Sequence, residues 1–95
     1  MYVVYNYLYG NVVGVYSTAE EARTASQRFV SSMPISVPKT DNLYFAIKMR
    51  TYGYILGVYT AYEDAKDMCD KQREEGYYMF IHHVCTSNYR RANEP

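Results

Sequence analysis

The chain has 95 residues and a mass of 11.1 kDa, which is the size of one domain. Ten basic and ten acidic residues give a formal net charge of zero, which argues against a polybasic nucleic-acid binder and against an acidic tail. Hydrophobic residues (48%) and charged residues (21%) match an ordinary globular domain, but 13 tyrosines beside three phenylalanines and no tryptophan do not.

The first half of the chain reads as a β-hairpin followed by a helix. The predicted order is a strand over residues 2–9, a return strand over 12–16 and a helix over 18–31. Gly10 supplies the turn, because glycine adopts a positive φ without strain. Ser17 and Glu20 have the spacing of a capping box, and Pro34 is expected to end the helix.

The second half predicts the same order and adds one strand. A strand covers residues 44–52, a return strand 55–59, a helix 61–75 and a fifth strand 77–84. Gly53 takes the turn position, and Thr60 with Glu63 forms the second capping box. Residues 34–43 read as a linker and residues 85–95 as a polar tail.

An internal repeat organises the chain. Tyr9–Arg23 aligns without a gap on Tyr52–Lys66 at a shift of 43 residues, with seven of 15 positions identical and five more conservative. This predicts one duplicated unit and a single domain over residues 1–95, with repeat units 1–33 and 44–76. The predicted fold is α+β in the order ββα-ββα-β, with an antiparallel sheet of four or five strands and both helices packed on one face.

Strand alternation assigns the residues of the two leading strands to faces. The helix side is predicted to hold Tyr2, Val4, Asn6, Leu8, Phe45, Ile47, Met49 and Thr51. The opposite, open face is predicted to hold Val3, Tyr5, Tyr7, Tyr9, Ala46, Lys48, Arg50 and Tyr52. This face combines tyrosines, which tolerate a half-wet surface, with two basic groups.

Three interpretations of that face stay open. Its tyrosines are β-formers on a solvated surface, or a surface for a protein partner or for self-association, or a stacking platform for a nucleotide-like ligand. In the third case Lys48, Arg50, Arg90 or Arg91 would contact phosphate. Zero net charge disfavours nucleic acid. The candidate binding residues are Tyr5, Tyr7, Tyr9, Lys48, Arg50, Tyr52, Arg90 and Arg91.

No pattern typical of catalysis or metal binding stands out. His82 and His83 are adjacent in a strand and point to opposite faces, and Cys69 and Cys85 match no standard zinc spacing. We expect no enzyme activity, no cofactor and no metal. The chain shows no signal peptide and no membrane-spanning stretch, so the expected location is the cytoplasm.

The motif G-V-Y-[ST]-x-x-E-[DE]-A occurs twice, at Gly14–Ala22 and at Gly57–Ala65. It resembles the hairpin-helix unit of small uncharacterised proteins of phages and large DNA viruses. The resemblance implies a small accessory protein that acts by binding a host or defence component, or a minor part of the virion. It carries no active-site residues to this chain.

Overall fold

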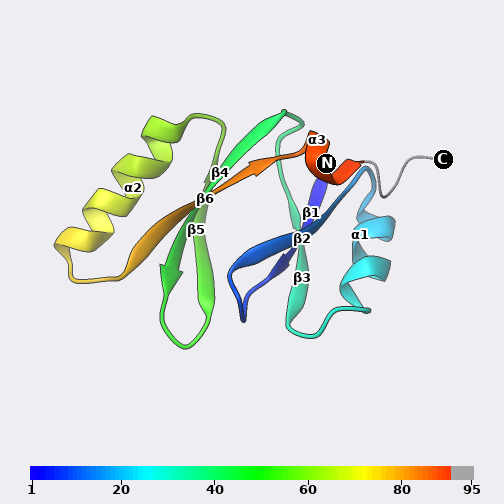
Figure 1. The fold of residues 1–95 in the computed structure, drawn as a ribbon, viewed down its shortest axis with the longest axis horizontal. Coiled ribbons are helices and arrows are strands. Elements are labelled where there is room, and N and C mark those ends of the chain that lie inside the picture. The colour runs from blue at the N-terminus through cyan, green and yellow to red at the C-terminus, as the bar shows by residue number, and fades with distance from the viewer. Residues whose placement is uncertain (91–95) are drawn as a thin grey trace.

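The computed structural model describes residues 1–90, without the side chain of Arg90. The elements follow one another as β1 (Tyr2–Asn6), β2 (Asn11–Tyr16), α1 (Ala19–Ser26), β3 (Ser32–Ser36), β4 (Asn42–Met49), β5 (Gly53–Tyr59), α2 (Tyr62–Glu74), β6 (Met79–Cys85) and α3 (Ser87–Arg90). Each half of the chain therefore runs strand, strand, helix, strand, and α3 follows the second half (Figure 1).

The strands form two antiparallel sheets of three strands each. Sheet A has the order β2-β1-β3 and sheet B the order β5-β4-β6. The sheets face each other in the middle of the molecule, with α1 outside sheet A and α2 outside sheet B (Figure 1). The predicted α+β class is confirmed, but the single sheet of four or five strands with both helices on one face is wrong.

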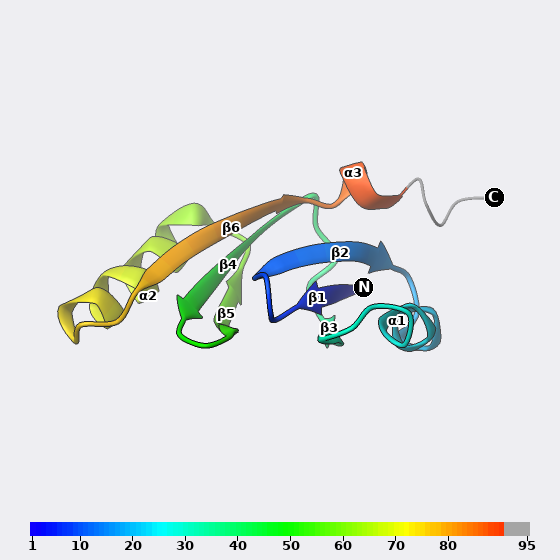
Figure 2. The same ribbon diagram turned by 60° about the horizontal axis from the view of Figure 1, so that its bottom comes forward.

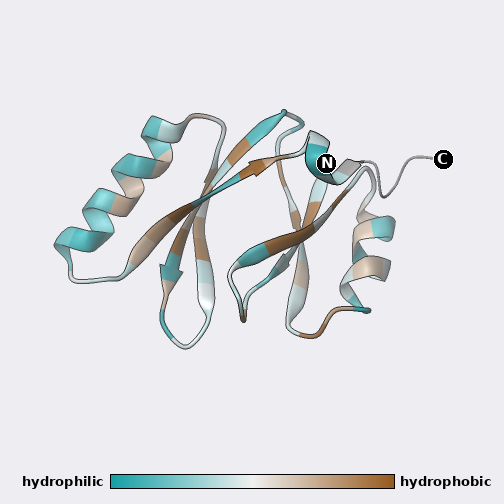
Figure 3. Ribbon diagram, viewed as in Figure 1, coloured by the Kyte–Doolittle hydropathy of each residue, from teal (hydrophilic) through white to brown (hydrophobic). Residues whose placement is uncertain are grey.

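A core of nine buried side chains joins the two sheets, and we call it the sheet-interface core. Its members are Val3, Tyr5, Val12, Val15, Val37, Leu43, Phe45, Ile47 and Val84. Apolar residues concentrate in the strands at the centre, whereas α2 is largely hydrophilic (Figure 3). Three-stranded sheets are too small to bury much surface alone, so covering one with the other removes the open face that the sequence predicted.

Each helix covers the outer face of its sheet through small side chains. Ala22 and Ala25 of α1 pack on Val4 of sheet A. On the other side, Cys69 of α2 packs on Ala46 of sheet B, together with Met79. Small side chains let each helix approach its sheet closely. A narrow apolar stripe on the helix is then enough to cover the sheet.

The face assignment is right for β1 and inverted for β4. Val4 lies under α1 as predicted, but Ala46 lies under α2, and Phe45 belongs to the sheet-interface core. Residues 7–10 connect β1 to β2, whereas only residues 50–52 connect β4 to β5. The strands before the turns therefore correspond at a shift of 42 residues instead of 43, and a slip of one residue exchanges the faces of a strand.

Gly14 and Gly57 each lie at a β-bulge and at a close contact between a side chain and the backbone. The pairing register shifts beside each of them, after Val4 opposite Gly14 and after Ala46 opposite Gly57. A Cβ at Gly14 would lie 2.6 Å from the Tyr16 hydroxyl oxygen, and one at Gly57 would lie 2.5 Å from the corresponding oxygen of Tyr59. In each G-V-Y segment, the glycine has no side chain, so the ring of the tyrosine two residues later can lie against the glycine backbone.

Helix α1 is shorter than predicted. It ends at Ser26, and residues 32–36, which include the start of the expected linker, form β3, which pairs with β1. Pro34 does not end the helix; it lies in this edge strand opposite Val4. A proline lacks the N–H of an inner strand but fits an edge, where the missing donor faces away from the sheet.

Both predicted capping boxes are wrong: the N-cap of α1 lies one residue later than expected, and α2 has no side-chain cap. The N-cap of α1 is Thr18, whose hydroxyl accepts from the Glu21 amide at 3.2 Å and donates to the Glu21 carboxylate at 2.9 Å. The N-cap of α2 is Ala61, which has no side chain able to cap. Because Thr18 aligns with Ala61 in the repeat, the first helix has a side-chain N-cap and the second does not.

Candidate functional site

Tyr5, the first candidate binding residue, is part of the sheet-interface core and not of an open face. It is 1% exposed, and its hydroxyl donates to the Gly53 carbonyl at 3.0 Å. Burial raises the pKa of Tyr5 to about 12. The prediction that Tyr5 stands on an open face is therefore wrong, since its side chain is buried between the two sheets.

Tyr7, Tyr9 and Tyr52 lie at the turns of the two hairpins. The ring of Tyr7 meets that of Tyr52 edge to face, with centroids 5.5 Å apart, and the Gly53 amide donates to the Tyr7 carbonyl. Gly53 has no positive φ; it is a glycine because the two halves approach closely there, and a Cβ would lie 3.2 Å from the Gly10 Cα atom. Tyr9 is 75% exposed at the tip of the β1–β2 turn.

Lys48 and Arg50 meet at an open groove of about 500 Å³ at the end of the β4–β5 hairpin. We call it the hairpin groove, and its lining residues are Lys48, Arg50, Thr51, Tyr54, Ile55 and Leu56. Lys48 and Tyr54 are directly paired across β4 and β5, so their side chains stand on the same face of sheet B as α2. The predicted basic pair thus shares a surface, although not the face that the sequence assigned to it.

The hairpin groove is cationic and aromatic. None of its lining residues is acidic, and within the described residues neither Lys48 nor Arg50 forms an ion pair. The Lys48 ammonium lies 3.6 Å from the centroid of the Tyr77 ring, a cation–π contact that holds the charge beside the groove. A groove of this kind can bind an anionic group that carries an apolar or aromatic part.

Tyr54 and Leu56 are the lining residues that the sequence interpretation missed. They are 47% and 37% exposed, whereas the first half of the chain has Asn11 and Val13 at the aligned positions. The sequence signal that could have identified Tyr54 is its replacement of Asn11 at the aligned position beside the turn. Arg91 lies outside the described residues, as does the side chain of Arg90, so neither is placed relative to the groove.

The two histidines point to opposite faces of sheet B, as predicted. His82 meets Phe45 at the sheet interface, and burial lowers its pKa, with a smaller contribution from the charge of His83. His83 stacks on Tyr44 at 4.7 Å and its Nε2 lies 2.8 Å from the Asn42 side-chain oxygen. Within the described residues, no three His, Cys, Asp or Glu side chains form a group that could hold a metal ion.

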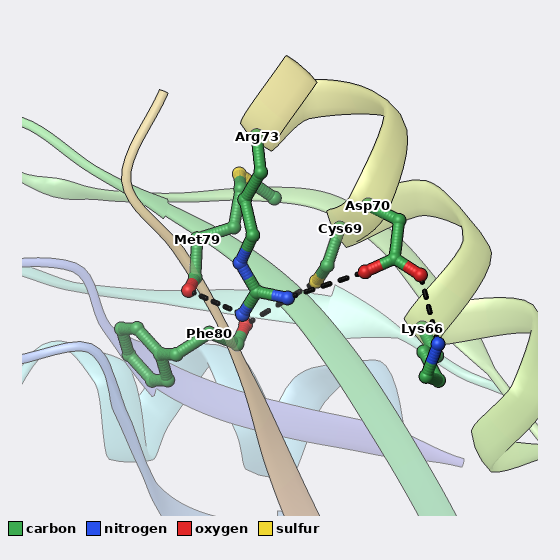
Figure 4. Close-up of polar contacts among 6 residues, drawn as sticks. All are labelled: Lys66, Cys69, Asp70, Arg73, Met79 and Phe80. Carbon is green, nitrogen blue, oxygen red and sulfur yellow. Dashed lines mark hydrogen bonds and ion pairs between the residues drawn. The ribbon is translucent and has the colours of Figure 1, made fainter. Parts of the chain in front are cut away.

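Helix α2 carries its own charge network, centred on Asp70 (Figure 4). Lys66 and Arg73 both pair with Asp70, at 2.9 and 3.4 Å, and the hydrogen bond from Lys66 lowers the pKa of the Asp70 carboxyl. Arg73 also donates to the Met79 carbonyl at 2.8 Å. Burial raises the pKa of the Cys69 thiol, which reduces its reactivity as a nucleophile.

Comparisons with known proteins add no relative. No protein-family model matches the chain, and neither the curated proteins nor the solved structures contain a match. No helix among the described residues combines the length and apolar character that crossing a membrane requires. The geometry of the hairpin groove therefore carries the functional argument.

Proposed function

We propose that this chain is a small non-enzymatic binding module that contacts a protein partner through the hairpin groove. The observation that carries the proposal is the pair of cations, Lys48 and Arg50, that lack ion-pair partners within the described residues and border exposed apolar side chains. Arginine and tyrosine are the residues that most often dominate protein interfaces. The matching partner surface is acidic with an apolar part.

Affinity capture with charge-reversed variants tests this proposal. Tagged wild-type chain should retain a partner that Arg50→Glu loses, because reversal replaces attraction by repulsion at the groove. Arg28→Glu is the matched control, since Arg28 is exposed near the end of α1 and outside the groove. Equal capture by the wild type and by Arg50→Glu would show that the hairpin groove is not the surface that binds the partner.

A nucleotide or cyclic nucleotide is the second candidate ligand. The exposed ring of Tyr54 lies in the same groove as the two cations, so a base could stack on the ring while phosphate contacts Lys48 or Arg50. A thermal-shift screen of nucleotides tests it, because a ligand of the folded state raises the melting temperature. Wild type should shift and Tyr54→Ala should not; no shift at saturating concentration removes this candidate.

We include in the proposal the origin of the chain by internal duplication and its role as a phage or viral accessory protein. The matching element order of the two halves and their equivalent bulges support an internal duplication. The repeated G-V-Y motif supports a phage or viral accessory protein that acts on a host or defence component in the cytoplasm, or a minor virion protein. Sheet B, which carries the groove, would then be the half that diverged toward binding.

A further inference from the structure

Three connections between elements lie along one edge of the molecule, at the bottom of Figure 1 and towards the viewer in Figure 2. Tyr7 joins them, because its amide donates to the Ser31 carbonyl at 3.0 Å and its carbonyl accepts from the Gly53 amide. We call this edge the loop edge. It consists of residues 7–10 between β1 and β2, residues 27–31 between α1 and β3, and residues 50–52 between β4 and β5.

The loop edge exposes large apolar side chains. Val30 is 86% exposed and Tyr9 is 75% exposed. Leu8, Phe29 and Tyr52 add further exposed apolar surface from the same three connections. Single apolar side chains are common on protein surfaces, but a group of them at one edge marks a contact surface.

The backbone of the loop edge is fixed by the buried side chain of Asn6. Its oxygen accepts from the amides of Leu8 and Tyr9 at 3.0 and 2.9 Å, and its nitrogen donates to the Val30 carbonyl at 3.3 Å. The next residue, Ser31, has a φ of 61°, in the left-handed region that residues other than glycine seldom adopt. Val30 is thus held outward on a strained turn, and such strain is typical of binding sites.

The charge of the loop edge is positive. Its three connections contain Arg28 and Arg50 and no acidic residue. Within the described residues, neither arginine forms an ion pair. Two copies that met at this edge would bring arginines against arginines, so charge disfavours self-association here. The complementary surface is anionic and accepts apolar side chains.

We propose that the loop edge docks on an anionic lipid surface, with its apolar side chains among the headgroups and its arginines beside the lipid anions. This peripheral contact needs no membrane-spanning segment. The apolar side chains come from three separate turns, and a lipid layer can receive them without the matched shape that a protein interface needs. Tyrosines and aliphatic side chains together are typical of the boundary between membrane and water.

The inference goes beyond the proposed function. Val30 and Arg28 are not among the residues that line the hairpin groove, so the two surfaces can be tested separately. Arg50 belongs to both surfaces, and for that reason it is not used to distinguish them.

Sedimentation with sucrose-loaded vesicles tests the docking. Vesicles of equal parts phosphatidylserine and phosphatidylcholine should carry the wild type into the pellet. Vesicles of phosphatidylcholine alone should bind at least about tenfold less, because each arginine near an anionic membrane strengthens binding about fivefold. Added salt should weaken the binding, because it screens this attraction.

Val30→Asp tests the apolar part of the contact. It should lower binding to the anionic vesicles at least about tenfold, because a carboxylate replaces an inserted apolar group among anionic headgroups. Tyr62→Asp is the matched control; Tyr62 is 48% exposed at the start of α2, on the side of the molecule away from the loop edge (Figure 1), and this variant should bind like the wild type. Val30→Asp should keep the urea midpoint of the wild type, because the Val30 side chain is exposed.

Arg28→Glu tests the charge and separates the two surfaces. It should weaken vesicle binding at least about tenfold, while the same chain still retains a protein partner of the hairpin groove. A wild type that does not bind the anionic vesicles, or that binds them no better than Val30→Asp, overturns the inference. A chain that ignores vesicles but loses a protein partner through Val30→Asp also overturns it, because a protein then covers the loop edge.

Discussion

The contact between Tyr5 and Gly53 gives the sharpest test of how the two halves pack. The Tyr5 hydroxyl is the donor that satisfies the buried Gly53 carbonyl across the sheet interface. Tyr5→Phe keeps the ring and removes this donor, so the carbonyl stays buried without that partner. The expected cost is about 1 to 2 kcal/mol of the free energy of unfolding.

Gly53→Ala perturbs the same contact from the other side. The added Cβ would lie 2.7 Å from the Tyr5 hydroxyl oxygen, which is too close for any real contact, and the expected cost is about 1 to 3 kcal/mol. In the Tyr5→Phe background that oxygen is absent, so Gly53→Ala should cost less there. Part of the cost remains, because the Gly10 Cα atom lies 3.2 Å from the same Cβ.

A double-mutant cycle by urea or thermal unfolding measures the coupling. We expect an interaction free energy of at least about 0.5 kcal/mol, and each kcal/mol lowers the melting temperature of a domain of this size by about 4 to 8 °C. Tyr9→Phe is the control on an exposed tyrosine and should change stability by less than about 0.5 kcal/mol. Additive costs, or a neutral Tyr5→Phe, would refute the packing of Tyr5 on Gly53.

Three further predictions follow from individual side chains. In urea unfolding, Thr18→Ala should lower the free energy of unfolding by about 1 kcal/mol, because it removes the N-cap of α1. Ala61→Thr should raise the free energy of unfolding by a similar amount, because it supplies an N-cap to α2. Gly57→Ala should cost about 1 to 3 kcal/mol in the same assay, and Gly57→Ala should cost less in a Tyr59→Ala background, where the colliding ring is gone. The pKa of His82 is lowered in the folded state, so the unfolded state binds more protons than the folded state just below pH 6.5. The contribution of His82 to the free energy of unfolding should therefore be constant above pH 6.5 and fall as the pH drops from 6.5 to the folded-state pKa. Urea titrations at about pH 7.5 and about pH 5 should show this loss of stability in the wild type and a smaller loss in His82→Gln.

Local patterns in the sequence predicted most of the elements. Both hairpins and α2 form near the expected residues, because β-branched runs, turn glycines and helical spacing act over a few neighbouring positions. Residues 32–36 were missed as a strand because Pro34 favours a linker, and only pairing with β1 makes an edge strand of them.

The arrangement of the sheets lay beyond the local patterns. The assignment of Lys48 and Tyr5 to one open face depended on a repeat shift of 43 residues, and the shorter β4–β5 turn changes that shift to 42 for the leading strands. Tyr5 then enters the core while Lys48 stands beside α2. Alternation reports which residues share a face, but only long-range packing decides whether a second sheet covers that face.

Affinity capture with reversed groove charges tests most directly whether the hairpin groove is the binding surface. The double variant Lys48→Glu/Arg50→Glu reverses the two cations that form no ion pair within the described residues, whereas Arg28→Glu reverses an exposed charge outside the groove. The account predicts that the double variant loses a partner that the wild type and the Arg28→Glu chain both retain. Equal retention by all three chains would contradict the account.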